Sequence, residues 1–284
     1  MKLLSYNGRF YQTNDLLISA NNRSFRYGDG FFETMKIIDG KIVLRDYHFE
    51  RLFSSLELLQ FDKPDYFTPQ YLEEQITELV LKNKHSKLAR IRLMIFRGDG
   101  ELYGTQNNFP NYIIQTWERK ETYNQLNKDG FVIDIFKDAR KACDNYSHVK
   151  SNNYLPYIMA SLWAQKNKLN DAIVLNAYDR IADTTIANIF ILKDGIIKTP
   201  LLTEGCVSGV MRRHLLKCMR DEGMPVEETS LTVEDIMQAR EVFLTNAGYG
   251  IRWVKQCAKS EYRNEFAEML YKKFITPLLK GTAQ

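Results

Sequence analysis

The residue with the clearest chemical potential is a lysine in an unusual setting. Lys150 follows a strand-like segment and precedes an apolar helix, whereas most lysines lie among other charges on a solvated face. A lysine at the mouth of a cleft is partly desolvated, and desolvation frees the amine to form a Schiff base. The alternative is an ordinary surface lysine, which is the more common fate of this residue.

Two further groups of residues suit an anion. The stretch 204–212 places two glycines and a serine at the start of an amphipathic helix, where backbone N–H groups have no intrahelical partner. His48 and Arg51 are three residues apart on another predicted helix, and the planar guanidinium suits a phosphate. Thr245 and Asn246 close a strand and could add donors. The alternatives are a glycine-containing loop that enters a helix and a surface arginine beside a satisfied histidine.

An acid enters a predicted buried strand at Asp183, followed by two threonines. A carboxylate in a core needs a partner, which is either a basic side chain or a heteroaromatic nitrogen of a ligand. The alternative is a turn in which Asp183 caps local N–H groups. Pyridoxal phosphate combines the carbonyl that suits Lys150, the phosphate that suits the glycine-rich helix start and the ring nitrogen that suits Asp183.

Other common chemistries lack their motifs. The tripeptide Gly28-Asp29-Gly30 lacks a third glycine and precedes a strand, so it supports a nucleotide-binding dehydrogenase only weakly. The chain has no Walker A, HExxH or GxSxG motif. We expect no metal site and reduced thiols, because no CxxC pair occurs among the four cysteines, Cys143, Cys206, Cys218 and Cys257.

The composition is that of a globular protein. The chain has 284 residues, of which 44% are hydrophobic and 26% charged, and its net charge of +4 is scattered. This pattern argues against a nucleic-acid partner. The sequence has no apolar run near the roughly 18 residues of a membrane span and no apolar leader, so we expect a cytoplasmic protein without a membrane partner.

Hydrophobic periodicity places these residues on elements of an α+β fold. In the first half we predict a hairpin at 35–44, helices at 48–59 and 72–80, and strands at 89–96 and 112–117. In the second half we predict strands at 131–136, 172–175, 187–192, 196–199 and 241–244, and helices at 158–163 and 207–219. The polar stretch 118–125 predicts a boundary between an N-terminal domain, 1–120, and a C-terminal domain, 121–284.

Taken in order, these motifs resemble those of the class IV aminotransferases, the fold-type IV pyridoxal-phosphate enzymes. Six segments across almost the whole chain carry the resemblance: 26–34, 48–52, 150–155, 181–190, 205–212 and 242–246. The resemblance implies a small N-terminal α/β sandwich and a larger C-terminal pseudobarrel domain. It also implies pyridoxal 5'-phosphate as cofactor and a homodimer with shared active sites.

The resemblance also suggests individual roles. Lys150 resembles the Schiff-base lysine that moves the α-proton, and Thr34 resembles a threonine that lies near it. Asp183 stands where the family usually has a glutamate bonded to the ring nitrogen, so the side chain is one methylene shorter. The expected cofactor-binding residues are Arg51, Lys150, Asp183, Thr185, Ile186, Val207, Val210, Met211 and Thr245. The expected substrate residues are Phe32, Arg92, Arg97, Tyr103 and Asn246.

The subgroup depends on three short features. D-amino-acid aminotransferases carry Arg-x-His where this chain has Leu102-Tyr103-Gly104, and branched-chain aminotransferases often have glycine in place of Thr34. Aminodeoxychorismate lyases have a similar threonine and the Lys-x-x-Asn spacing of Lys150 and Asn153. The resemblance therefore favours the lyase, which releases pyruvate and leaves 4-aminobenzoate for folate synthesis. A branched-chain-type or D-amino-acid-type aminotransferase and a non-catalytic cofactor carrier are the alternatives, and Thr34 also fits a strand by propensity.

Overall fold

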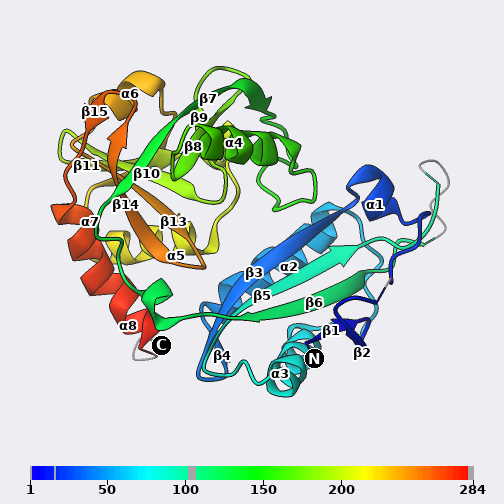
Figure 1. The fold of residues 1–284 in the computed structure, drawn as a ribbon. Coiled ribbons are helices and arrows are strands. Elements are labelled where there is room, and N and C mark those ends of the chain that lie inside the picture. The colour runs from blue at the N-terminus through cyan, green and yellow to red at the C-terminus, as the bar shows by residue number, and fades with distance from the viewer. Residues whose placement is uncertain (1, 16, 102–106, 281–284) are drawn as a thin grey trace. The chain divides into compact units, whose positions relative to one another are not determined.

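The computed structural model describes residues 2–15, 17–101 and 107–280. The contacts between Cα atoms divide it into two units (Figure 1). The first unit comprises Met1–Glu121 and Lys150–Asn153, and the second comprises Thr122–Val149 and Tyr154–Gln284. The lysine segment thus groups with the first unit, although a division at residue 120 assigns it to the second.

The first unit is built on a six-stranded antiparallel sheet in the order β2-β1-β6-β5-β3-β4. The strands are β1 (Leu3–Tyr6), β2 (Arg9–Gln12), β3 (Gly30–Ile38), β4 (Lys41–Ile42), β5 (Leu88–Phe96) and β6 (Asn111–Glu118). The predicted hairpin is confirmed, since Asp39 and Gly40 join β3 to β4 with φ values of 47° and 78°. A turn with two positive φ values matches the twist of the flanking strands.

Two long helices cover one face of this sheet. The two long helices are α2 (Arg45–Leu58) and α3 (Pro69–Lys82), and the periodicity that predicted them is confirmed. A short helix, α1 (Arg23–Tyr27), precedes β3. Leu52 of α2 and Ile76 of α3 are fully buried, as are Ile91 and Leu93 of β5. Because side chains alternate along a strand, Arg92 lies on the opposite face of β5.

The second unit contains a nine-stranded mixed sheet, β12-β11-β10-β13-β14-β7-β8-β9, with β15 paired to β14. Its strands are β7 (Phe131–Lys141), β8 (Asp171–Asn176), β9 (Ile181–Thr184), β10 (Asn188–Lys193), β11 (Ile196–Pro200), β12 (Val226–Thr229), β13 (Glu241–Asn246), β14 (Gly250–Cys257) and β15 (Ser260–Glu261). Its helices are α4 (Leu155–Lys166), α5 (Val210–Asp221), α6 (Val233–Met237), α7 (Glu265–Leu270) and α8 (Thr276–Leu279). Short helical turns are η1 (Glu121–Asn124), η2 (Leu202–Glu204) and η3 (Tyr271–Ile275). The α+β prediction is confirmed.

Two elements of the second unit differ from those that the hydrophobic periodicity predicted. The prediction that Val207 lies on the helix of 207–219 was wrong, because Gly209 is the extended N-cap residue and α5 begins at Val210. Strand β7 continues past Phe136 to Lys141 through a register shift against β8. Such a shift re-aims the strand, which an alternating pattern cannot reveal.

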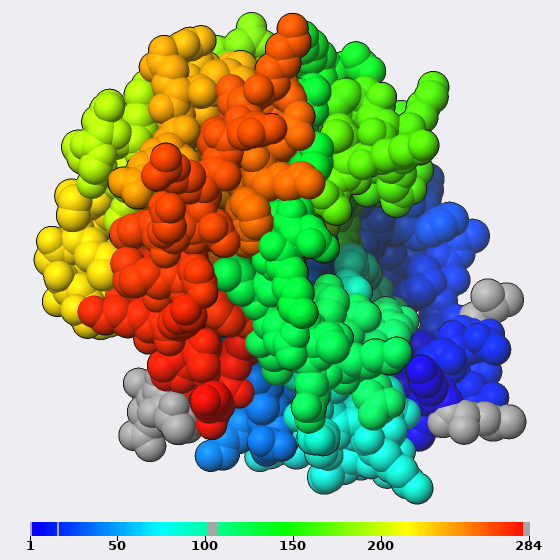
Figure 2. Space-filling model, turned by 60° about the vertical axis from the view of Figure 1, so that its left-hand side comes forward, coloured from blue at the N-terminus to red at the C-terminus, as the bar shows by residue number. Residues whose placement is uncertain are grey.

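The C-terminal helices pack within the second unit. In Figure 2 they appear in red beside the green segment that opens this unit. The hydroxyl of Tyr271 donates a hydrogen bond of 2.6 Å to the carbonyl of Asn124. In the described part of the chain, no helix is long and apolar enough to cross a membrane.

Candidate active site

Lys150 is held against the start of β3 by backbone hydrogen bonds. The amide of Phe32 donates to the carbonyl of Lys150 at 3.0 Å, and the amide of Asn152 donates to the carbonyl of Gly30 at 2.9 Å. A Cβ atom at Gly30 would lie 2.6 Å from the carbonyl oxygen of Ile95. Glycine is therefore required where the lysine segment joins β3.

The ammonium of Lys150 lies over an aromatic ring. Its Nζ is 4.9 Å from the ring centroid of Phe32, and the guanidinium of Arg92 is 3.8 Å from the same centroid. Thr34 lies two residues after Phe32 on β3 and pairs in register with Arg92 of β5. Phe32, Thr34 and Arg92 therefore share one face of the sheet. The structure brings Phe32 close to Lys150, and Arg92 and Thr34 lie on the same sheet face as Phe32.

His48 and Arg51 do converge on one target, and that target is a protein carboxylate. Arg51 donates from Nε to Oε1 of Glu33 at 2.7 Å and from Nη2 to Oε2 at 2.6 Å. His48 Nδ1 lies 2.7 Å from Oε2 of Glu33, and the side chains of His48 and Glu33 are at most 1% exposed. Sequence reasoning missed Glu33, although it lies within the motif 26–34.

The protonation states in this cluster follow from burial and charge. Burial alone would raise the pKa of Glu33, but the charge of Arg51 and the contacts with His48 and Arg51 lower it to about 2. Burial lowers the pKa of His48 and outweighs the opposite effect of Glu33. Glu33 is therefore ionised and His48 neutral at pH 7, so Nδ1–H donates to the carboxylate.

Arg97 lies with its guanidinium inside the first unit. It forms an ion pair of 2.6 Å with Asp29 and donates to Asn108 at 3.0 Å and to the carbonyls of Leu59 and Gln60. Its side chain also lines a cavity of about 680 Å³ that includes Asp29. A role of Arg97 in substrate binding remains a prediction. Tyr103, the neighbouring candidate, lies outside the described residues.

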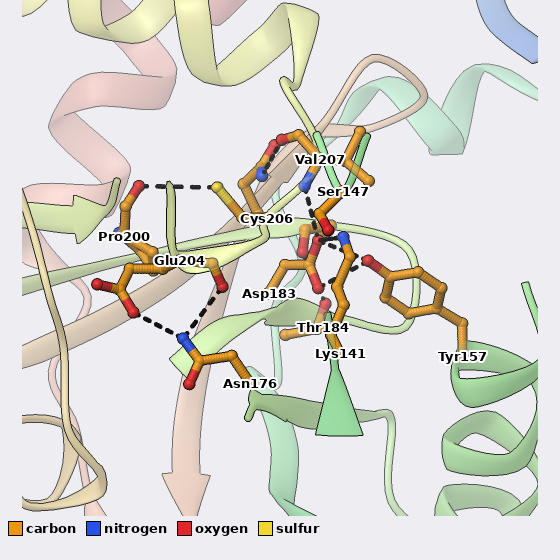
Figure 3. A network of polar contacts seen from close by, with 12 residues as sticks. Lys141, Ser147, Tyr157, Asn176, Asp183, Thr184, Pro200, Glu204, Cys206 and Val207 are labelled. Atoms are coloured by element: carbon orange, nitrogen blue, oxygen red, sulfur yellow. Dashed lines mark hydrogen bonds and ion pairs between the residues drawn. The ribbon is translucent and has the colours of Figure 1, made fainter. Parts of the chain in front are cut away.

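Asp183 lies on β9 and has a basic partner, as a buried carboxylate must. Nζ of Lys141 is 3.5 Å from Oδ2, and the hydroxyl of Tyr157 is 3.0 Å from Oδ1 and 2.9 Å from Oδ2 (Figure 3). The amide of Val207 also donates to Oδ2, at 3.0 Å. The alternative of a local turn cap is therefore wrong. Sequence reasoning missed Lys141 and Tyr157, which reach Asp183 from β7 and α4.

The start of α5 is shaped for close approach to a ligand. No side chain of the described residues caps this helix at Gly209. Its first backbone amides, including those of Val210 and Met211, therefore have no side-chain acceptor from a cap. A Cβ atom at Gly209 would lie 1.8 Å from Oδ1 of Asn188. The Nδ2 group of Asn188 donates to the carbonyl of Val207 at 2.8 Å. Asn188 thus ties the loop before α5 to the sheet.

Thr245 supplies an independent sign of an anion site. It is fully buried on β13, opposite Asn188 of β10, and its Oγ1 has no hydrogen-bond partner among the described residues. A buried hydroxyl without a partner costs about 1–3 kcal/mol. Because α5 packs against β13, the unpaired hydroxyl of Thr245 and the uncapped N-terminus of α5 suit a phosphate. These residues fit pyridoxal phosphate.

A second buried acid organises the turn after β9. Asp171 accepts hydrogen bonds from Oγ1 of Thr184 at 2.9 Å and from Oγ1 of Thr185 at 2.6 Å. Thr185 is thus held by the protein, whereas Ile186 is 55% exposed and its carbonyl accepts from Asn246 at 3.3 Å. Their expected contacts with cofactor and substrate remain predictions. Asp171 was missed, although an acid at the start of a buried strand is a usable signal.

Comparison with known sequences places these residues in a family context. The family described as amino-transferase class IV matches residues 30–257. A Methanocaldococcus jannaschii protein described as a putative branched-chain-amino-acid aminotransferase is 30% identical over 84% of this chain and 82% of its own length. The aminodeoxychorismate lyase of Bacillus subtilis is 27% identical over 98% and 96%. The D-alanine aminotransferase of Listeria innocua is 26% identical over 87% and 84%.

A solved structure shows the same fold. The branched-chain aminotransferase of Thermoproteus uzoniensis, determined with norvaline, matches with a TM-score of 0.88 at 22% sequence identity. The match covers 100% of this chain and 96% of the other. At this identity the likeness concerns the fold alone, and it confirms the predicted two-domain architecture.

Proposed function

Because the chain belongs to the class IV aminotransferases and is an enzyme of that family, we propose that it is a pyridoxal-phosphate enzyme in which Lys150 carries the cofactor. The amine of Lys150 would bind the cofactor covalently, and once the substrate's amino group has displaced it, the free amine would move a proton at the α-carbon of the substrate. Asp183 would bond the ring nitrogen, and Thr245 and the start of α5 would hold the phosphate. The resemblance also assigns Arg51 to the phosphate, although its guanidinium already donates to both oxygens of Glu33. When bound, the cofactor withdraws electrons from the amino-bearing carbon.

For the reaction, we favour release of pyruvate from 4-amino-4-deoxychorismate, which gives 4-aminobenzoate. The observation that carries this choice is the position of Thr34 on the sheet face of Phe32, whose ring lies 4.9 Å from Nζ of Lys150. A hydroxyl on the sheet face that Lys150 covers could orient the amine or relay its proton. Arg92, on the same face, would bind a substrate carboxylate.

The alternative reactions are branched-chain-type and D-amino-acid-type transamination. Support for the first comes from the relative that is 30% identical over 84% of this chain. A non-catalytic cofactor carrier is the remaining alternative, because aspartate stands where glutamate was expected. We also propose a homodimer, which sedimentation of the purified protein would test.

Cofactor attachment is tested by borohydride reduction of the loaded protein and peptide mapping. The label should lie on Lys150, and Lys150→Ala should lose it. The matched control is Lys166→Ala, which removes an exposed lysine on α4 and should leave the label unchanged. Labelling of another lysine, or of none, would contradict the proposal.

The reaction is tested by parallel assays of pyruvate release from aminodeoxychorismate and of transamination with L- and D-amino acids. Formation of 4-aminobenzoate without transamination is the expected result. Thr34→Val, which keeps the shape and removes the hydroxyl, should lower lyase turnover at least tenfold with unchanged cofactor content, while Thr34→Ser should retain most of it. Transamination without 4-aminobenzoate would exclude the lyase, and an unchanged cofactor spectrum with every substrate would indicate a carrier.

A further inference from the structure

A buried cation, a carboxylate and a phenol form one cluster around β9 (Figure 3). The side chains of Lys141 and Asp183 are 11% and 3% exposed, and Nζ of Lys141 also lies 5.0 Å from the ring centroid of Tyr157. On the premise of the proposed function, we propose that Lys141 and Tyr157 are positioning residues that act through Asp183 and make the cofactor's ring nitrogen less basic than a lone carboxylate would.

Asp183 retains the capacity to accept a ring N–H. A carboxylate offers about four lone-pair sites on its two oxygens. Oδ2 accepts from the amide of Val207, the ammonium of Lys141 and the Tyr157 hydroxyl, whereas among the described residues Oδ1 accepts only from that hydroxyl. Oδ1 is therefore the oxygen that can accept from the ring nitrogen.

The charge beside that nitrogen is set by Lys141. Burial raises the pKa of Tyr157 well above its usual value and raises the pKa of the Cys206 thiol to about 12, so both groups are neutral at pH 7. Tyr154, the other titratable group in contact with Tyr157, has its ring centroid 4.6 Å from that of Tyr157. The Lys141 and Asp183 charges cancel, and a neutral pair favours a protonated ring less than an isolated carboxylate does.

The size of the effect follows from the distance. A ring nitrogen bonded to Oδ1 of Asp183 at about 2.8 Å would lie roughly 6 to 8 Å from the Lys141 ammonium, which is 3.5 Å from Oδ2. At an effective dielectric constant of about 20, a unit charge at that distance lowers the pKa of the ring nitrogen by about one and a half to two pKa units, and partial solvation reduces this to about one or two. The hydrogen bond from Tyr157 acts in the same direction, because it stabilises the carboxylate and weakens it as an acceptor.

The chain reaches this arrangement through two local features. The register shift of β7 after Phe136 brings Lys141 opposite Asn176 of β8, and β8 pairs with β9 at Asp183. Tyr157 lies in the first turn of α4 and is buried. Both groups therefore depend on the packing of α4 and β7 against the strands that carry Asp183.

The test uses the full protein loaded with ¹⁵N-labelled pyridoxal phosphate, because the ¹⁵N chemical shift of the ring reports its protonation directly. A pH titration of Lys141→Met should show a ring-nitrogen pKa about one to two units above wild type, and Lys141→Arg should stay near wild type. Tyr157→Phe should raise it by a smaller amount. The matched control is Lys193→Met, which breaks another lysine–aspartate pair of 2.9 Å, to Asp235, and should leave the titration unchanged.

The outcomes distinguish failure of this inference from failure of the proposed function. Titration of Lys141→Met at the wild-type value would overturn the inference, while cofactor attached to Lys150 would still support the proposed function. If Lys141→Met does not retain cofactor, the titration of Tyr157→Phe takes its place as the test. A ring-nitrogen pKa equal to that of wild type in Tyr157→Phe would then overturn the inference. Absence of cofactor from Lys150 in wild type refutes the proposed function itself.

Discussion

Replacement of Glu33 by glutamine should destabilise the protein strongly at neutral pH. The variant keeps the shape of the side chain but removes the charge that balances the guanidinium of Arg51, whose side chain is 12% exposed. Loss of one partner from a buried ion pair costs about 3–5 kcal/mol, because the remaining charge stays desolvated. The hydrogen bond from His48 Nδ1, 2.7 Å long, also loses its charged acceptor.

The pH dependence of stability gives the sharper test. The pKa of Glu33 is about 2 in the folded protein, against 4.5 for an unperturbed glutamate. A depressed carboxyl pKa stabilises the fold fully above about pH 4.5, and this contribution disappears as the pH falls towards 2. The shift corresponds to about 3 kcal/mol. His48, whose pKa burial lowers, adds a separate loss as the pH falls below 6.5, and the glutamine variant retains that loss.

Urea unfolding between about pH 2 and pH 8 measures both effects. The difference between wild type and Glu33→Gln should be largest above about pH 5 and should shrink below about pH 4, because Glu33 of the unfolded wild type takes up a proton near pH 4.5 whereas folded Glu33 stays ionised down to about pH 2. The control is Glu121→Gln, which removes an exposed partner of Lys87 and should leave the unfolding midpoint nearly unchanged, since exposed pairs contribute little. Parallel curves for wild type and Glu33→Gln across the whole range would refute the assignment of an ionised Glu33 that balances the charge of Arg51.

Three further substitutions test the second unit. Gly209→Ala would place a Cβ atom 1.8 Å from Oδ1 of Asn188, so the start of α5 must shift, and fluorescence titration should show cofactor affinity at least tenfold weaker. The control is Gly100→Ala in the first unit, where the nearest atom of the described residues would lie 3.4 Å from the new Cβ, and it should leave the affinity unchanged. Thr245→Val should leave the unfolding temperature of the cofactor-free protein unchanged or raise it, because it removes an unsatisfied hydroxyl. The same variant should weaken cofactor binding about tenfold, or about 1.4 kcal/mol by calorimetry. A lower unfolding temperature of the cofactor-free variant would contradict this prediction. Asp171→Asn should lower the free energy of unfolding, measured in urea, by about 1–3 kcal/mol, because the amide NH2 group replaces an oxygen that accepts from the hydroxyls of Thr184 and Thr185. Equal stability of the variant and wild type would show that these hydrogen bonds contribute little.

The sequence alone determined the local elements and the types of reactive residue. The Asp39–Gly40 hairpin and the amphipathic helices α2 and α3 depend on turn chemistry and periodicity within a few residues, so they are readable without tertiary contacts. The ordered motifs likewise identified Lys150 and Asp183 as candidates, because their chemistry is carried by residue type and by neighbours in the chain.

Only the tertiary structure decided which partners these residues have. Lys150 joins β3 through backbone pairing with Phe32, and Asp183 meets Lys141 from a shifted strand and Tyr157 from a helix. Periodicity assigns a residue to a face of its own element but carries no information about the residue that faces it from a distant segment. The partners of Asp183 therefore come from long-range packing, which local patterns do not encode.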